Sequence, residues 1–220
     1  MIKLVAFDWN GTVFSDTYAV LDSVNQLLKS LELKRITLAK FQKYFDVPVE
    51  KAYFEFGISK EVLRKQKYFI THNFHINYEP RAAKVRTRAF ARFLLRWLVD
   101  NNVKSIIFSN HLDEPIRKQL KRLKIDKYFS AVLANLNEET VFESRAKEKR
   151  LKRYIKDNHL SGNQIIVIGD TVEEVEIGKT VGAVTLGLTH GFCSIARLKA
   201  ARPDYLISSL KEVINIIKKS

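Results

Sequence analysis

Polar side chains stand directly after three short apolar runs of the sequence. Asp8, Ser109 and Asp170 each follow such a run. Runs of this length are typical of buried β-strands, and an open parallel sheet binds its ligands in the crevice at the carboxyl ends of its strands. A carboxylate there can act as a nucleophile or hold a hard cation, and a hydroxyl beside backbone N–H groups can hold a phosphate oxygen. These residues therefore predict one polar site at the tips of a sheet.

Helical patterns alternate with short apolar strands from Arg81 onward. The helix and strand pairs are 91–100 with 103–110, 116–124 with 128–135, 147–157 with 163–170, and 176–182 with 183–188. This alternation predicts an α/β fold with a doubly wound parallel (Rossmann-like) sheet. The first apolar run, residues 2–7, must join the same sheet although a long segment separates it from the other strands.

Residues 17 to 81 contain no convincing strand. Apolar residues recur three and four positions apart in residues 17–33, which predicts one face of a helix. Shorter helices are expected on both sides of Pro48. Gly57 is expected to end one helix and Ser59 to cap the next.

These patterns predict a chain in two parts. Residues 1–15 and 82–220 form the α/β core domain, and residues 16–81 form an inserted all-helical cap domain over the strand tips. Residues 77–80, which end in a proline, are interpreted as the linker that leaves the cap.

Composition limits the class of protein. The chain has 220 residues and 46% hydrophobic residues, which is enough for a sizeable core, and its single cysteine, Cys193, excludes an internal disulfide. No stretch approaches the roughly 20 apolar residues that a membrane span needs, and the first residues lack the regions of a signal peptide. We therefore expect a cytoplasmic protein with no membrane partner. Nothing in the sequence indicates an oligomeric state.

The formal net charge is +14, from 38 Lys and Arg against 24 Asp and Glu. The basic residues recur in segments 81–97, 116–124 and 144–156, where apolar residues alternate with them at helical spacing. This pattern favours solvated helix faces. No zinc-ligand spacing and no signature of an RNA-binding sheet accompanies it, so we expect a small anionic substrate rather than nucleic acid.

Four motifs in order resemble those of the haloacid dehalogenase-like (HAD) phosphohydrolases of the phosphoglycolate-phosphatase-like kind. The opening DWNGT, residues 8–12, is similar to the family's Asp-x-Asp-Gly-Thr, with Asn10 in place of the second aspartate. Ser109 matches the second motif, and Lys147, 23 residues before Asp170, matches the third. The fourth motif is usually Gly-Asp-x-x-x-Asp, and here Glu174 replaces its last aspartate.

The resemblance implies a magnesium-dependent phosphatase that acts on a small phosphorylated substrate. Asp8 would be the nucleophile and form an aspartyl-phosphate, while Lys147 would neutralise the transferred group. The phosphate would be bound by Thr12, Ser109 and Asn110, and Mg²⁺ by Asp8, the Asn10 backbone carbonyl and Asp170, with Glu174 behind them.

Asn10 stands where the family has its general acid and base. An amide neither releases nor takes up a proton at neutral pH, so this chain lacks that group unless another side chain replaces it. His111 and His190 are the candidates by sequence position. Substrates that leave as stable anions, such as aryl and acyl phosphates, are expected to react better than an alkyl phosphate such as phosphoglycolate.

Two alternatives stay open at this point. Phosphonoacetaldehyde hydrolases also resemble this opening, and they cleave a carbon–phosphorus bond with a lysine of the cap, for which Lys51 is the nearest analogue. A catalytically weakened protein of the same fold that binds a polyanion would also account for Asn10, Glu174 and the net charge of +14.

Overall fold

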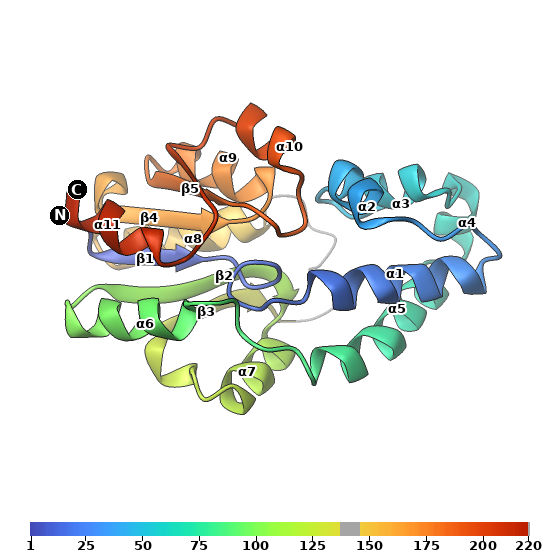
Figure 1. The fold of residues 1–220 in the computed structure, drawn as a ribbon, viewed down its shortest axis with the longest axis horizontal. Coiled ribbons are helices and arrows are strands. Elements are labelled where there is room, and N and C mark those ends of the chain that lie inside the picture. The colour runs from blue at the N-terminus through green and yellow to red at the C-terminus, as the bar shows by residue number, and fades with distance from the viewer. Residues whose placement is uncertain (137–145, 220) are drawn as a thin grey trace.

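A parallel sheet organises the core of the molecule (Figure 1). The computed structural model describes residues 1–136 and 146–219, and within them six strands form one sheet in the order β3-β2-β1-β4-β5-β6. The strands are β1 (Leu4–Phe7), β2 (Lys104–Leu112), β3 (Ala131–Asn135), β4 (Ile165–Gly169), β5 (Val184–Leu188) and β6 (Tyr205–Ile207). All neighbouring strands pair in parallel, which confirms the predicted fold class.

Helices cover both faces of this sheet because its strands carry apolar side chains on both sides. The helices are α6 (Ala91–Asp100), α7 (Asp113–Arg122), α8 (Ala146–Asp157), α9 (Val172–Thr180), α10 (Ile195–Ala200) and α11 (Glu212–Lys219). Val5 and Phe7 of β1 pack into the same cluster as α6 and α11, while Leu4 and Ala6 pack with α8 and α9. A central strand buried on both faces is thereby held in place along its whole length.

Five helices lie between residues 17 and 82, at the right of Figure 1. They are α1 (Thr17–Ser30), α2 (Leu38–Tyr44), α3 (Glu50–Phe56), α4 (Lys60–Lys65) and α5 (Lys67–Ala82). Gly57 ends α3 in the left-handed region at φ 107°, and the Ser59 side chain accepts a hydrogen bond from the Val62 N–H at the start of α4. Both predicted signals are therefore confirmed.

The predicted linker at residues 77–80 is wrong, since these residues lie inside α5. Pro80 cannot donate the usual backbone hydrogen bond within the helix, which costs stability. Tyr78 is nevertheless buried, and its phenol donates to the Asp16 carboxylate at 2.7 Å. This tertiary anchor holds the last turns of α5 in place, so the helix continues through the proline.

Two short segments connect the helical block to the core, and they run side by side. The Ser15 N–H donates to the Arg86 carbonyl at 3.1 Å, and the Arg88 N–H donates to the Val13 carbonyl at 2.9 Å. The Phe14 ring, which is fully buried, stacks on Trp9 at a centroid distance of 5.0 Å. The predicted domain boundaries, after residue 15 and before residue 82, lie next to these segments and stay a prediction.

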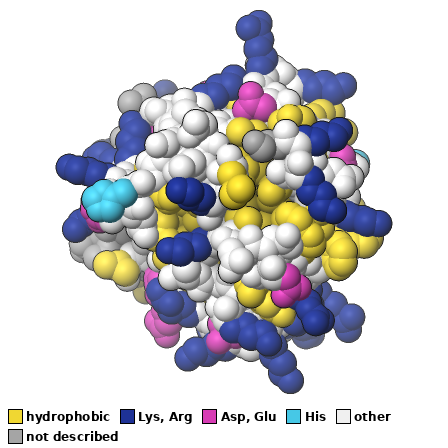
Figure 2. Space-filling model, turned by 90° about the vertical axis from the view of Figure 1, so that its left-hand side faces the viewer, with side chains coloured by type: hydrophobic (Ala, Val, Ile, Leu, Met, Phe, Trp, Pro, Cys, Tyr) yellow, Lys and Arg dark blue, Asp and Glu magenta, His cyan; other side chains and the backbone are white. Residues whose placement is uncertain are grey.

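Basic side chains are spread over the face of the molecule that carries the chain termini. Figure 2 shows Lys and Arg distributed around the face that carries the chain termini, with hydrophobic patches between them, rather than gathered in one basic area. The predicted basic segment 144–156 falls partly on α8, and its first two residues lie outside the described residues. Among the described helices, none combines the length and the apolar character that crossing a membrane requires.

Asn25 offers a test of what holds the helical block together. Its buried side chain donates to the Ile36 carbonyl at 3.1 Å and accepts from the Ile36 N–H at 2.8 Å, which ties α1 to the segment before α2. We expect Asn25→Ala to lower the free energy of unfolding by about 1–3 kcal/mol, because it leaves two buried backbone groups unpaired. Urea denaturation measures this loss. Gln26→Ala, at the neighbouring exposed position, is the control, and an equal effect of both changes would contradict the assignment.

Candidate active site

The tips of three adjacent strands bring the predicted polar residues together. Asp8 follows β1, Ser109 lies in β2, and Asp170 follows β4. Because β1 lies between β2 and β4, the three residues lie on adjacent strands although they are far apart in the sequence, and Asp170 is close enough to help raise the pKa of Asp8. All three are buried.

Lys147 reaches this point from the first turn of α8. Its side chain is 2% exposed, and its Nζ lies 2.7 Å from the Asp8 Oδ1 atom, 3.5 Å from Glu173 and in contact with Glu174. Burial alone would lower the pKa of Lys147, but the three carboxylates outweigh it and raise the pKa well above its usual range. The lysine is therefore a fixed positive charge beside Asp8.

Two other basic residues near Lys147 contact other groups. Arg150 donates to the Asn135 side chain and to the Ser109 carbonyl, and Lys152 pairs with Glu148 on the exposed side of α8. Lys149 is exposed, and Arg145 lies outside the described residues. The structure thus places Lys147, as predicted from its distance to Asp170, against the proposed nucleophile.

Asp170 is enclosed by its neighbours. Its two carboxylate oxygens accept from the Thr12 hydroxyl and from the Phe192 N–H, both at 2.6 Å. A Cβ atom added at Gly11 or Gly191 would come within 2.3 or 2.1 Å of the Asp170 carboxylate, so both positions require glycine for this close approach. Burial, followed by the charge of Glu174, raises the pKa of Asp170 to about 7.

Negative charge exceeds positive charge at the strand tips. Lys147 faces Asp8, Glu173 and Glu174, and burial also raises the pKa of Asp8 well above its usual range, with Glu174 and Asp170 adding to the effect. Two buried carboxylates whose charged forms are disfavoured are a suitable donor pair for a divalent cation. The described residues contain no group of three or more His, Cys, Asp or Glu side chains arranged to hold a metal. Mg²⁺ commonly uses only one or two carboxylates and keeps several waters, so the residues present fit it.

Glu174 holds the lysine rather than pointing into open space. One of its oxygens contacts Lys147, and the other accepts from the Thr171 N–H at 3.0 Å and from the Thr171 hydroxyl at 2.6 Å, which closes a capping box at the start of α9. The same interactions lower the pKa of Glu174 against the effect of burial. The predicted metal ligation by Glu174 stays a prediction, and the contacts place it behind Lys147.

Asn10 belongs to a hydrogen-bonded network that the sequence did not indicate. Its side-chain amide donates to the Asp16 carboxylate at 2.6 Å and to the Tyr78 hydroxyl at 3.0 Å. Asp16 is completely buried and also accepts from the Gly11 N–H at 2.8 Å. Burial raises the pKa of Asp16. An amide at position 10 can donate to the Asp16 carboxylate, which an ionised aspartate at that position could not do.

Ser109 and Asn110, predicted to bind phosphate, both line the cavity above Asp8. The Ser109 hydroxyl accepts from the His111 N–H at 3.1 Å, and the Asn110 amide donates to Glu173 at 2.7 Å. Thr12, the third predicted phosphate ligand, is buried and donates to Asp170. The contacts of Thr12 fit a role in holding Asp170, and the binding roles of the three stay predictions.

The two histidines that could replace the missing general acid lie in different environments. His111 lines the cavity, but burial lowers its pKa to about 4, so at neutral pH it is uncharged and has no acidic proton to donate readily. His190 is exposed, and its contact is a backbone one, with its carbonyl accepting from Arg88. Lys51, the lysine on which the phosphonate alternative depends, is exposed on α3 and does not line the cavity.

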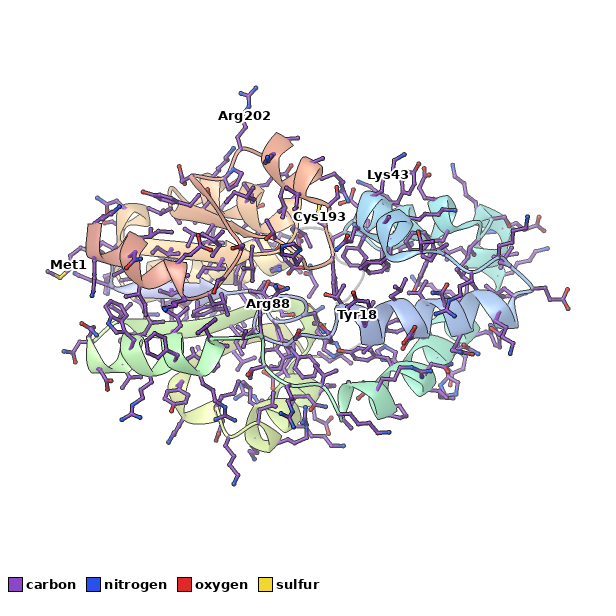
Figure 3. The ribbon with its side chains drawn as sticks, in the orientation of Figure 1. Met1, Tyr18, Lys43, Arg88, Cys193 and Arg202 are labelled. Atoms are coloured by element: carbon purple, nitrogen blue, oxygen red, sulfur yellow. The ribbon has the colours of Figure 1, made fainter. Side chains whose placement is uncertain are left out.

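Arg88 was not foreseen from the sequence. Its guanidinium donates to the backbone carbonyls of Gly11 at 2.6 Å and of Thr189 and His190 at 3.1 Å each. Figure 3 shows it at the junction between the sheet and the helical block. It therefore links the loop after β1, the loop after β5 and the returning connection from the helices.

A cavity of about 540 Å³ opens above these groups. Asp8, Asn10 and Lys147 lie at its base, and its walls continue to side chains of α1 to α5. A ligand on Asp8 would therefore be enclosed between the strand tips and the helical block.

Comparisons with known proteins identify a family and relatives of this chain. A family model described as haloacid dehalogenase-like hydrolase matches residues 5–188. The phosphoglycolate phosphatase of Aquifex aeolicus is 22% identical over 98% of this chain and 97% of its own. Pyrophosphatase PpaX of Listeria welshimeri is 21% identical over 56% of each chain. A haloacid dehalogenase-like family hydrolase from Streptococcus pneumoniae superposes with a TM-score of 0.82 over 98% of both chains at 19% identity.

The hydrogen bond between Asn10 and Asp16 predicts what happens when the amide and the carboxylate exchange positions. Asn10→Asp would place a second carboxylate about where the amide now donates at 2.6 Å. We expect the free energy of unfolding at neutral pH to fall by about 2 kcal/mol or more, since a hydrogen bond to a charged group is replaced by repulsion. The double variant Asn10→Asp/Asp16→Asn restores one amide and one carboxylate, and we expect it to recover most of the loss. Chemical denaturation of the three proteins decides, and a double variant no more stable than the single one would contradict the pairing.

His111 predicts a pH dependence of stability. Its pKa is about 4 in the folded protein against 6.5 without burial, so the unfolded chain binds the proton more strongly. The free energy of unfolding should therefore fall as the pH is lowered from 6.5 toward 4. The free energy of unfolding of the His111→Gln variant should fall less over this pH range. The His159→Gln variant, changed at an exposed position, should show the same fall as the unchanged protein. Urea denaturation at several pH values tests this, and parallel curves for His111→Gln and the unchanged protein would contradict it.

Proposed function

The chain belongs to the haloacid dehalogenase-like hydrolase family, and on that premise we propose that it is a magnesium-dependent phosphatase with Asp8 as its nucleophile. The substrate is a small phosphorylated compound. The phosphoglycolate phosphatase and the pyrophosphatase among its relatives support phosphoryl transfer to water as the type of reaction.

The ion pair between Lys147 and Asp8 carries this proposal. A buried lysine 2.7 Å from a strand-tip carboxylate counteracts part of the rise that burial causes in the pKa of Asp8, and a bound Mg²⁺ would add to this effect. The pair engages the Oδ1 atom and leaves Oδ2 as the attacking atom. Lys147 also provides positive charge where the equatorial oxygens of the transferred phosphoryl group gather negative charge.

The reaction proceeds in two steps. In the first, the Asp8 carboxylate attacks phosphorus, the bond between phosphorus and the leaving oxygen breaks, and the leaving group departs with the electron pair. In the second, water attacks the aspartyl-phosphate and releases inorganic phosphate and the free Asp8 carboxylate. Ser109 and Asn110 line the cavity beside this carboxylate and would bind the phosphoryl oxygens.

Mg²⁺ would be held by the carboxylates of Asp8 and Asp170 and by the Asn10 backbone carbonyl. When bound, it supplies positive charge to the phosphoryl oxygens and to the two carboxylates. The Asn10 side chain does not enter this set, so the exchange of aspartate for asparagine leaves the backbone ligand unchanged. Thr12 and the Phe192 N–H hold Asp170 in position for it.

The leaving group must depart without a protonated carboxyl at position 10. The Asn10 amide is fully engaged as a donor to Asp16 and Tyr78, and His111 is neutral near pH 7. General acid catalysis typically contributes roughly 10²- to 10⁴-fold, so an alkoxide leaving group loses about that much in rate. Phenolates, carboxylates and phosphate leave as stable anions and lose little.

Phosphate release from three substrates tests the function. We expect turnover of phenyl phosphate and acetyl phosphate that requires Mg²⁺, and turnover of phosphoglycolate that is slower by about 10²-fold or more. Chelation of Mg²⁺ or Asp8→Asn should abolish release from all three.

Two variants of α8 serve as a matched pair in the same assay. Lys147→Met removes the buried cation beside Asp8 and should lower kcat/KM by about 10²-fold or more, the size seen for preorganised charge stabilisation. Lys152→Met, on the exposed side of the same helix, should leave it unchanged. Absence of release from every substrate, or release that survives Asp8→Asn, would overturn the proposal.

A further inference from the structure

The cavity above Asp8 is larger than a small phosphate ester requires. Its volume is about 540 Å³, within the range of pockets that enclose a ligand of drug size, whereas a two-carbon leaving group would fill only a small part of it. The cavity extends from Asp8 and Lys147 to residues of α2 and α3. The leaving group of the substrate, which points away from the phosphoryl group, therefore faces the helical block.

Aromatic rings form one wall of this cavity. Phe41 of α2 and Phe45, the residue directly after α2, pack against Phe192 of the loop after β5. Their ring centroids lie 5.7 and 4.8 Å from the centroid of that ring. Phe56 of α3 adds a fourth ring, 6.1 Å from Phe41. Rings in offset and edge-to-face arrangements favour a further aromatic ring in contact with them. The wall connects the helical block to the loop that also holds Asp170.

Glu50 places a carboxylate group at the helical side of this cavity. It begins α3 and lines the same cavity, yet its Oε2 atom is shielded from solvent and receives no hydrogen bond from the residues that the structure describes. Burial raises the pKa of Tyr53, and the nearby charge of Glu50 raises it further. A shielded carboxylate oxygen without a donor is uncommon in native proteins and is costly unless a ligand supplies the donor.

We propose that the leaving group is aromatic and carries a hydroxyl or amino group that donates a hydrogen bond to Glu50. This inference rests on the proposed phosphatase function and names the class of substrate: an aryl phosphate with a hydrogen-bond donor on the ring. The phosphoryl group lies on Asp8, the ring contacts the Phe41, Phe45 and Phe192 wall, and the donor reaches the start of α3.

Two independent features favour the same class. Asn10 cannot protonate a leaving oxygen, which favours a phenolate over an alkoxide, and the cavity wall separately favours an aromatic ring. Lys60 and Arg64 also line the cavity and would attract the phosphate dianion toward it. They do not distinguish one leaving group from another.

Binding of phosphonates, which cannot be hydrolysed, tests the class without relying on turnover. Titration calorimetry in the presence of Mg²⁺ would compare benzylphosphonate with propylphosphonate, and then hydroxymethyl-substituted with methyl-substituted benzylphosphonate, each as the 3- and the 4-isomer. We expect benzylphosphonate to bind about tenfold more tightly than propylphosphonate. We also expect the hydroxymethyl compound to bind about tenfold more tightly than its methyl counterpart for at least one isomer, because a hydrogen bond to a charged group is gained.

Glu50→Ala should abolish the preference for the hydroxyl and leave the binding of the methyl compounds within about twofold. Glu55→Ala, on the exposed side of the same helix, should retain the preference. Equal binding of benzyl and propyl phosphonates would overturn the aromatic part, and a hydroxyl preference that is absent, or that survives Glu50→Ala, would overturn the role of Glu50.

Phosphate release from phenyl phosphate, measured in parallel, separates the two proposals. Selective phosphonate binding without any release would keep the ligand class, an aromatic phosphate or phosphonate with a hydrogen-bond donor, and remove the phosphatase function. Phosphate release without selective phosphonate binding would keep the phosphatase function and remove the proposed aromatic class.

Discussion

The buried ion pair between Lys147 and Asp8 is the interaction on which the rest of the site depends. A lysine that is 2% exposed is costly to bury unless its charge is matched, and here three carboxylates match it. Glu174 is fixed in turn by the capping box of α9, and Asp8 by the pairing of β1 between β2 and β4. The strand order, two helix starts and one lysine therefore form a single arrangement, in which the sheet provides the geometry and the lysine places a positive charge beside Asp8.

A second set of contacts ties the helical block to that arrangement. Tyr78 of α5 reaches Asp16 and Asn10, and Arg88 joins the loops after β1 and β5. The two connecting segments also pair with each other at Ser15 and Arg86. As a result, the cavity above Asp8 has one wall from the core and others from the helices, and the environment of the leaving group is determined by residues of both parts. The rings of Phe41, Phe45 and Phe192 show this directly, since they come from both sides.

Asn10 illustrates how one local substitution changes the chemistry that a site can perform. The amide is compatible with its surroundings because Asp16 is buried beside it and requires donors rather than a second negative charge. The network that stabilises Asn10 therefore also removes a proton donor from the reaction. For the proposed reaction, the expected consequence is selectivity for leaving groups that are stable as anions, which follows from the chemistry of this position rather than from the shape of the cavity.

The sequence by itself determined the elements and the order of the site residues, because short apolar runs, helical spacing and strand-end polar residues are local patterns. It placed Asp8, Ser109, Lys147 and Asp170 at element ends that the structure brings together. It misread residues 77–80 as a linker, since the anchor that keeps α5 helical, Tyr78 to Asp16, spans 62 positions. It also gave no sign of Arg88, whose importance lies in its contacts, or of the Oε2 atom of Glu50, which has no hydrogen-bond donor among the described residues. Only the tertiary structure decided which side chains face one another and which charges are shielded from water, because burial and Coulomb interactions depend on distances in space and not on positions along the chain.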